Sequence, residues 1–482
     1  MRWRYIFRVV GQLTLFMGLS MVFSFAVGLY YADSSVYPLL LCILLTTGSG
    51  FAVYIGFRRI TIESMSTREG MAIVFLGWVA AGLFGALPFY FGIESCSYTD
   101  AFFESVSGFT TTGASTLEDI EGISKGILFW RSLIQWLGGM GIIVLSLAVL
   151  PFLRVGGMQL YKAEVPSPEP DKLKPRIKET AAILWKVYIM LTAIQTILLW
   201  FGGMSLFDSL CHAFTTMPTG GFSTRNASIA YYNSTYFDML FIIFMILAGI
   251  NFTLHYQLLR GKPLAFWHDL ECRFYLGLLL VLIAIVSINI YGDVYKSFAH
   301  SIRLAAFQVA SIMTTTGFAT ADYLQWPVMS QLILWVCMFI GASAGSTGGG
   351  IKCLRIMLLF KYCYRELFSL VHPNAIAHLK ISGKPIPNDI IRSVMGFFVL
   401  YVGLFAICSI LLAGLGVDFI TAIGAVAASI GNIGPGFGLV GPAGNYAGIP
   451  LLGKWLLAWC MLLGRLEIYT VIIFLAPEFW RK

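Results

Sequence analysis

Apolar runs long enough to cross a lipid bilayer recur along the whole chain of 482 residues. A membrane-spanning helix needs about 20 consecutive, mostly apolar residues. Ten such spans are predicted, over residues 9–31, 37–57, 70–92, 127–152, 182–204, 237–259, 274–292, 328–361 with an interruption, 391–414 and 453–476. Hydrophobic residues make up 58% of the chain and charged residues only 12%, which excludes a cytosolic globular enzyme. We therefore expect an all-α polytopic membrane protein.

The distribution of Lys and Arg predicts the orientation of these helices. When the N-terminus is placed inside and the spans alternate, most of the 32 Lys and Arg residues fall on the inner side, as is typical of cytoplasmic loops. Both termini are therefore expected in the cytoplasm. The basic inner loops 153–181 and 362–390 favour contact with anionic membrane lipids. Because the net charge of +8 forms no single patch, we expect no nucleic-acid partner.

The outward connections after the first two spans share one unit that occurs four times. Each unit is a short apolar helix followed by a strip rich in Thr or Gly, and the strips are Thr110–Ala114, Thr219–Phe222, Thr314–Phe318 and Asn432–Gly436. One glycine of each strip aligns with the others: Gly113, Gly221, Gly317 and Gly434. Self-similarity of this kind indicates a repeated supersecondary unit.

The four short helices are predicted to enter the membrane from outside and to stop halfway. A helix of about ten residues cannot cross a bilayer. Each strip then returns as extended backbone, which is tolerated at that depth only where it lines water or protein. Four such returns predict one shared pore. The C-terminal end of each half-helix carries partial negative charge, which favours a cation over an anion there.

The half-helices do not begin identically. Asp100, Asp208 and Asp418 stand where three of them start, and each is expected to cap free backbone amides. The third unit has Leu304 at this position, so the predicted pore is only pseudo-symmetric.

With its two extra N-terminal spans, its four strips and an interruption near residues 341–350, the chain resembles the Trk/Ktr/HKT superfamily of potassium transporters. Within it, the resemblance is to the bacterial TrkH/TrkG membrane subunits. It implies two N-terminal helices followed by four pseudo-symmetric repeats of helix, pore helix, filter and helix around one pore. The corresponding segments are 1–60 for the N-terminal helices, then 61–160, 161–262, 263–370 and 371–482 for the four repeats.

The resemblance also implies which residues hold the transported potassium ion. In the family, ions are bound mainly by carbonyls of the two residues before each filter glycine. Together with the glycines, the positions carried over are Thr111, Thr112, Gly113, Thr219, Gly220, Gly221, Thr315, Thr316, Gly317, Asn432, Ile433 and Gly434. Members that keep glycine in all four repeats favour potassium, and no organic cofactor is implied.

The interruption of the eighth span is interpreted as a gate. Glycine or hydroxyl residues dominate Gly341–Gly350, so no stable helix is expected there, although a packing kink is the alternative. Arg465 lies midway along the last span, where a charge is costly unless it faces the pore or a partner. We expect Arg465 to donate to this loop, since Glu467, only two residues away, points to another face. The predicted gate residues are Gly345, Gly348, Gly349, Gly350 and Arg465.

Two other functions stay open at this stage. Gly341–Gly345 also matches GxSxG, so an intramembrane serine protease with Ser343 as nucleophile is a remote alternative. A proton- or sodium-coupled secondary cation transporter is a closer one, although such transporters are typically built from inverted repeats, whereas all four units here enter from one side. The resemblance adds a homodimer, a cytoplasmic nucleotide-binding regulatory subunit of TrkA type, and the bacterial cytoplasmic (inner) membrane as location.

Overall fold

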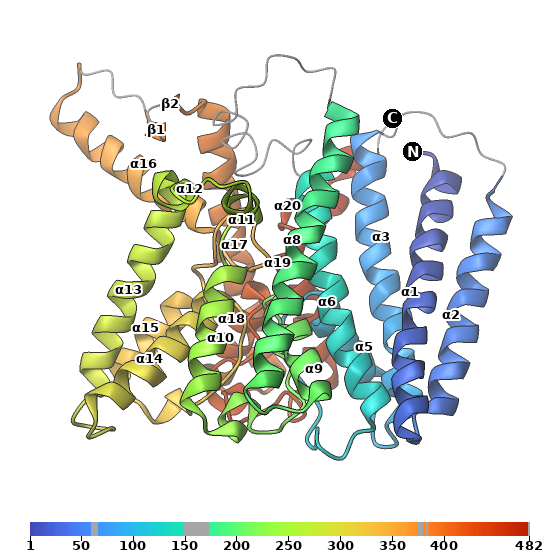
Figure 1. Ribbon diagram of the computed structural model, residues 1–482. Helices are drawn as coiled ribbons and strands as arrows, with labels where there is room; N and C mark the ends of the chain where they lie inside the picture. Colours follow the sequence, from blue (N-terminus) through green and yellow to red (C-terminus); the bar gives the residue numbers. More distant parts are fainter. Residues whose placement is uncertain (59–65, 149–172, 375–378, 382–383, 481–482) are drawn as a thin grey trace.

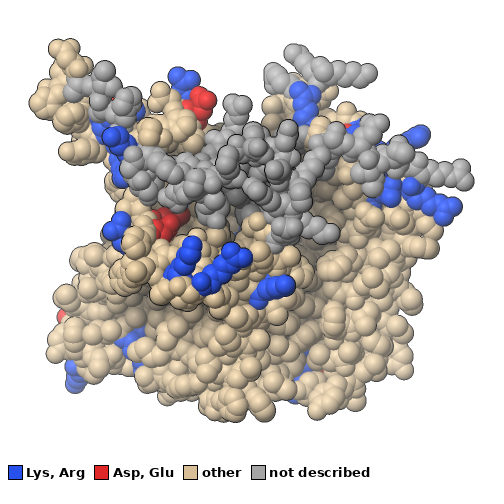
Figure 2. All heavy atoms as spheres, turned by 45° about the horizontal axis from the view of Figure 1, so that its top comes forward, with Lys and Arg blue, Asp and Glu red and all other residues tan. Residues whose placement is uncertain are grey.

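The structure is a computed structural model, and it describes residues 1–58, 66–148, 173–374, 379–381 and 384–480. Long helices run side by side through the molecule, and both chain termini lie at the same end (Figure 1). Six helices are long and apolar enough to cross a membrane: Trp3–Tyr31, Val36–Gly56, Arg68–Gly92, Thr180–Phe201, Leu270–Ile290 and Asn388–Gly414. Lys and Arg side chains gather toward the end that carries the termini, above a broad uncharged surface (Figure 2). The prediction of a nearly all-helical, multi-pass membrane protein is confirmed.

The first two helices form an antiparallel pair at one edge of the molecule (Figure 1). They are α1 (Trp3–Tyr31) and α2 (Val36–Gly56), and α1 also packs against α3 (Thr67–Gly85) and α6 (Lys125–Ala148). Small residues allow close approach, because a Cβ atom placed on Gly50 would lie 2.6 Å from the backbone nitrogen of Leu15. Such small-residue contacts are how helices associate in lipid, where apolar side chains alone give little drive.

The remaining helices follow one order four times, which is consistent with the four predicted repeats. The first set is α3 (Thr67–Gly85), α4 (Leu87–Gly92), the short α5 (Tyr98–Phe109) and α6 (Lys125–Ala148). The second is α8 (Leu173–Phe201), the short α9 (Leu206–Thr216), α10 (Thr235–Ala248) and α11 (Phe252–Leu259). The third is α13 (Leu270–Ile290), the short α14 (Phe298–Met313), α15 (Val328–Cys337) and α16 (Cys353–Val371). The fourth is α17 (Asn388–Gly414), the short α18 (Phe419–Gly431), α19 (Leu451–Arg465) and α20 (Tyr469–Ile472).

Minor elements connect these sets. They are η2 (Ser228–Tyr232), α12 (Ala265–His268), η3 (Tyr323–Gln325), η4 (Gly438–Val440), η5 (Ile473–Leu475) and α21 (Pro477–Trp480). Two two-residue strands, β1 (Lys380–Ile381) and β2 (Lys384–Pro385), pair antiparallel in the basic segment before α17. The predicted repeat boundaries at residues 60 and 160 fall outside the described residues.

The spans that end two of the repeats are broken, which the apolar pattern did not reveal. Helices α10 and α11 meet at an angle of 100°, so the predicted span over 237–259 is not one continuous helix. The Asn251 side chain accepts a hydrogen bond from Thr253 N at 2.9 Å and so starts α11 as a separate helix. The predicted span 453–476 also breaks, because Glu467 and Ile468 take positive φ angles of 62° and 42°. The predicted interruption between α15 and α16 is present.

Serine, rather than aspartate, caps two of the short helices. Ser97 accepts from Asp100 N at 3.2 Å, and Ser205 accepts from Asp208 N at 3.0 Å. The expected capping by these two aspartates was therefore wrong, although acids in the first turn still suit the helix dipole. Asp418 is a cap as predicted, accepting from Thr421 N at 3.0 Å, and hydrogen bonds from Thr421 lower its carboxyl pKa.

Candidate functional site

The four Thr- and Gly-rich strips share one backbone conformation. In each strip the aligned glycine and the residue two positions before it have positive φ angles. The pairs are Thr111 (54°) and Gly113 (81°), Thr219 (58°) and Gly221 (73°), Thr315 (59°) and Gly317 (83°), and Asn432 (56°) and Gly434 (98°). Positive φ is uncommon for Thr, so its recurrence at equivalent positions marks a conformation that the surroundings impose.

The strips close into a ring in which each glycine abuts the next strip. A Cβ atom on any of the four glycines would collide with the carbonyl oxygen of the residue that precedes the glycine of the following repeat. The separations are 2.1 Å from Gly113 to Gly220 O, 1.9 Å from Gly221 to Thr316 O, 1.9 Å from Gly317 to Ile433 O and 2.7 Å from Gly434 to Thr112 O. The order one, two, three, four and back to one places all four strips around a single axis.

The amides of the strips turn back to the short helices. The residue before each glycine donates its N–H to a carbonyl five residues earlier: Thr112 to Ser107 at 2.8 Å, Gly220 to Thr215 at 2.8 Å, Thr316 to Ser311 at 2.8 Å and Ile433 to Ala428 at 2.9 Å. These donors are thereby satisfied, and the carbonyl oxygens of the same four residues lie where neighbouring strips meet. That of Gly220 also accepts a hydrogen bond from Gln135. The short helices also end here, so their partial negative charge adds to that of the carbonyls. Such a ring attracts a cation and can replace part of its water.

Residues of neighbouring repeats bond to one another around the outer rim. Lys454 Nζ lies 2.6 Å from Asp100 Oδ1, which joins the fourth repeat to the first. The Tyr323 hydroxyl donates to Gly436 O at 2.6 Å, which joins the third to the fourth. The Tyr446 hydroxyl donates to Gly434 O at 2.7 Å and so fixes the fourth strip directly. The first two bonds therefore join neighbouring repeats, and the third fixes the fourth strip from within its own repeat.

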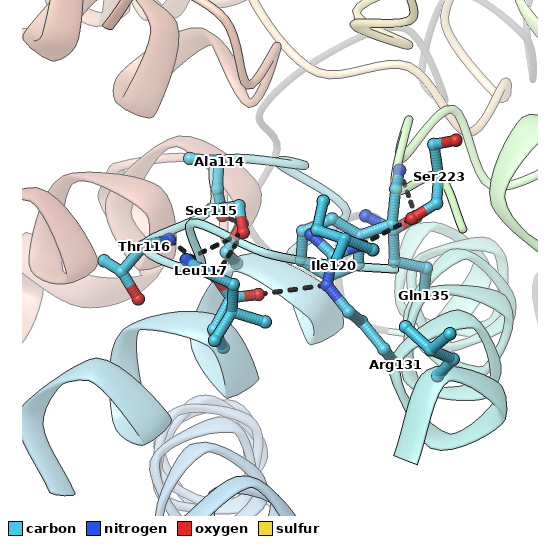
Figure 3. A network of polar contacts seen from close by, with 12 residues as sticks. Ala114, Ser115, Thr116, Leu117, Ile120, Arg131, Gln135 and Ser223 are labelled. Atoms are coloured by element: carbon cyan, nitrogen blue, oxygen red, sulfur yellow. Dashed lines mark hydrogen bonds and ion pairs between the residues drawn. The ribbon is translucent and has the colours of Figure 1, made fainter. Parts of the chain in front are cut away.

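A buried ion pair supports the residues that follow the first two strips. Arg131 of α6 and Glu104 of α5 have side chains that are 3% and 0% exposed, and Arg131 Nε lies 3.2 Å from Glu104 Oε2. Arg131 also donates to Ser223 O at 3.0 Å. Glu104 accepts from Thr116 N and from the Ser115 hydroxyl, both at 2.6 Å. In Figure 3, Arg131 lies between the turn after the first strip and Ser223 after the second.

Gln135, which the sequence reasoning missed, holds the second strip. Its side-chain Nε2 donates to Gly220 O at 2.7 Å, and its Oε1 accepts from Phe222 N at 3.1 Å. The amide therefore bridges the residues on either side of Gly221. A lone polar amide within an apolar span was the only signal that the sequence offered for this role.

The segment 341–350 is a non-helical loop that packs against the ring. Gly345 and Gly350 take positive φ angles of 75° and 61°. Gly349 N donates to the Thr315 hydroxyl at 2.6 Å, so the loop touches the third strip itself. A Cβ atom on Gly348 would lie 2.7 Å from that of Ala342, which shows how tightly the loop folds on itself. The four predicted gate glycines therefore lie in one compact loop below the filter residues.

The predicted contact between Arg465 and this loop is present. Arg465 is 3% exposed, and its Nη1 donates to Thr347 O at 2.8 Å. Its Nε and Nη2 have no hydrogen-bond partner among the described residues. Glu467 pairs instead with Arg355 of α16, while Lys352 Nζ donates to Gly348 O. Lys352 and Arg355, both inside the predicted eighth span, were not singled out from the sequence.

Glu271 of α13 bonds both to the loop and to the first turn of the helix that follows it, and sequence reasoning also missed this residue. Its Oε1 accepts from Ala344 N at 2.6 Å and from Leu354 N, in the first turn of α16, at 3.1 Å. One carboxylate thus holds a loop amide and caps the helix that follows the loop. No sequence pattern connects residue 271 with a segment more than 70 positions later.

Among the described residues, no hydrolytic centre forms at Ser343. Its hydroxyl has no hydrogen-bond partner within the described part of the chain. His212 bonds to Asp208 O and to the Ser223 hydroxyl, and His255 bonds to Leu247 O, so neither serves Ser343. A GxSxG match without a base within reach lacks the geometry of a nucleophilic site.

The chain matches the family model of the TrkH cation transport proteins over residues 41–482. It is 42% identical to the Trk system potassium uptake protein TrkH of Salmonella typhimurium and 37% identical to TrkG of Escherichia coli, over 99–100% of each chain. The crystal structure of the potassium transporter TrkH from Vibrio parahaemolyticus superposes with a TM-score of 0.93 at 38% identity, covering 100% of both chains. This family transports ions, which removes the serine protease alternative. The chain therefore belongs to the TrkH family of cation transport proteins.

Proposed function

We propose that this chain is the ion-conducting membrane subunit of a Trk-type potassium uptake system. The observation that carries the proposal is the closed ring of four strips, in which each filter glycine meets a carbonyl of the next repeat. The relatives are named for potassium uptake. Division of the chain into N-terminal helices 1–60 and repeats 61–160, 161–262, 263–370 and 371–482 belongs to the same proposal.

A potassium ion entering from outside loses part of its water to the carbonyls of the ring. The groups that replace this water are the carbonyls of the two residues before each filter glycine, assisted by the C-terminal ends of α5, α9, α14 and α18. Anions are disfavoured by the same partial charges. The glycines permit the close approach of the strips, since any side chain there would displace a neighbouring carbonyl.

The loop 341–350 and Arg465 form the gate below this filter. The Arg465 guanidinium, bonded to Thr347 O, places a positive charge beneath the carbonyl ring and holds the loop there. A buried cation on the ion path raises the electrostatic barrier to potassium. Opening then requires Arg465 and the loop to part.

Assembly and location complete the proposal. The basic end of the molecule (Figure 2), which carries both termini, faces the cytoplasm of a bacterial cell across its inner membrane. This face receives a nucleotide-binding regulatory subunit of TrkA type, and the membrane subunit forms a homodimer. The Trk system named for the relatives is the support for such partners.

Flux through purified protein in liposomes tests the transport proposal. A potassium gradient with a proton ionophore drives uptake of potassium, rubidium, sodium or lithium under matched conditions. We expect potassium and rubidium to exceed sodium without any required counter-ion, and Arg465→Ala to raise the flux of the subunit alone. Flux that vanishes without a proton or sodium gradient would instead establish a coupled transporter, and an unchanged Arg465→Ala flux would remove the gate assignment.

A further inference from the structure

The inner ends of the four filters differ in what their side chains contact. Each filter carries, two positions before its glycine, a residue of positive φ whose side chain is completely buried: Thr111, Thr219, Thr315 and Asn432. These four positions are equivalent in the ring. Because the backbone conformation is the same, differences between their side-chain hydrogen bonds reflect the residues that pack against each filter.

Three of the four side chains stay within the filter or the helices around it. Thr111 Oγ1 has no hydrogen-bond partner among the described residues. Thr219 Oγ1 donates to the neighbouring Pro218 O. The Asn432 amide donates to Thr112 Oγ1 at 2.9 Å and to the backbone of α19. None of these contacts reaches the loop 341–350 through a hydrogen bond.

Thr315 is different, because its hydroxyl accepts a hydrogen bond from the loop, from Gly349 N at 2.6 Å. The adjoining loop atoms press on the ring at the same place. A Cβ atom on Gly349 would lie 2.4 Å from Gly431 O, and one on Gly348 would lie 3.2 Å from Thr314 O. The loop thus contacts the third filter at Thr314 and Thr315, and it contacts the end of α18 and the Asn432 side chain at the start of the fourth filter.

We propose that Thr315 is a positioning residue that couples the loop to the filter, an inference that rests on the proposed role of the loop as a gate. Its hydroxyl holds the Gly349 amide while the loop lies under the ring. When the loop moves away, the Thr315 oxygen loses this partner and becomes a ligand for a potassium ion leaving the carbonyl ring. Thr111 Oγ1, already without a partner, takes part in the same inner site.

The chemistry of a hydroxyl group makes this exchange possible. A threonine oxygen has two acceptor positions, one of which the Gly349 amide occupies in this structure. A neutral oxygen next to the carbonyl ring is the type of ligand that a partly dehydrated potassium ion accepts. Release of the loop therefore adds the Thr315 oxygen as a ligand at the inner end of the filter. The same movement opens the ion path below the filter.

Three matched variants of the full-length subunit test this coupling. Thr315→Val removes the hydroxyl without changing the shape of the side chain, and Thr315→Ser keeps it. Thr111→Val makes the same change in the first filter, where no bond to the loop exists. The readouts are rubidium flux through the isolated subunit in liposomes and the ratio of potassium to sodium flux. Size-exclusion chromatography establishes that each variant is folded, and Thr315→Ala replaces Thr315→Val if the latter is not.

We expect Thr315→Val to raise rubidium flux about three- to tenfold above Thr111→Val, as loss of one loop hydrogen bond predicts. Thr315→Ser, which keeps the hydroxyl, should raise rubidium flux less than Thr315→Val does, and both valine variants should lower the potassium-to-sodium ratio. Equal flux for Thr315→Val and Thr111→Val, in a preparation where Arg465→Ala does raise flux, would overturn the coupling and leave the gate intact. If neither Thr315→Val nor Arg465→Ala changes flux, the gate proposal itself fails.

Discussion

Removal of the Glu271 carboxylate should free the loop beneath the filter. Oε1 of Glu271 is the acceptor for two partly buried backbone amides, that of Ala344 in the loop and that of Leu354 in α16. In Glu271→Ala both amides lose this acceptor. When the loop moves into water the Ala344 amide regains a partner, so the cost of that amide falls on the closed arrangement alone. Glu271→Gln retains an acceptor oxygen and should have a much smaller effect.

The size of the effect follows from the Ala344 bond. A buried donor without an acceptor costs about 1–3 kcal/mol, and since this bond is partly buried its loss raises the free energy of the closed arrangement by about 1 kcal/mol. Since about 1.4 kcal/mol corresponds to a factor of ten, the ratio of open to closed molecules rises about fivefold. Flux through the isolated subunit should rise by that factor or until every molecule is open.

The assay is rubidium uptake into liposomes by the full-length subunit, with unfolding followed in detergent. Asp269→Ala is the matched control. Asp269 caps α13, the helix that carries Glu271, by accepting from Cys272 N at 2.6 Å, and it does not bond to the loop. We expect the control to lower thermal stability without raising flux. A folded Glu271→Ala protein with the flux of the control would refute the assignment of Glu271 as the anchor of a mobile loop.

Two further substitutions test the ring and its support. Gly221→Ala should abolish potassium uptake in cells that depend on this subunit, because the new Cβ would lie 1.9 Å from Thr316 O. Gly203→Ala is the control for backbone strain. Gly203 has a φ of 97° but nothing within 4 Å of its Cβ position, so this variant should retain uptake. Arg131→Met leaves Glu104 buried without its partner and should destabilise the protein by about 3–5 kcal/mol, measured as a lower midpoint of unfolding. The double variant with Glu104→Gln should recover most of that loss, and no recovery would argue against the ion pair as the cause.

The four strips and the loop 341–350 were predictable because their signals lie within short stretches of sequence. The aligned glycines, such as Gly113 and Gly317, follow apolar segments too short to cross a membrane, which limits what the backbone can do. The interruption at 341–350 was visible for the same reason, as its glycines exclude a regular helix. Arg465 stood out because a charge within an apolar span needs a polar neighbour.

The supports of the pore were not predictable, because they depend on contacts between distant segments. Gln135 bonds to the backbone of the next repeat, and Glu271 bonds to a backbone amide more than 70 residues away in its own repeat. No local pattern indicates such a partner. The break between α10 and α11 was hidden because apolar residues continue on both sides of it, and hydropathy does not register backbone direction. Asp208 was expected as a cap because the preceding Ser205, an equally good one, was overlooked.

The position of bound ions tests the central claim, that the four strips form one filter, most directly. Anomalous diffraction from crystals of this protein grown in rubidium or caesium would locate the ions independently of any assumption about the path. The account predicts a peak on the common axis, surrounded by the carbonyl oxygens of Thr112, Gly220, Thr316 and Ile433. A peak held by a single repeat, or bound ions only outside this ring, would contradict it.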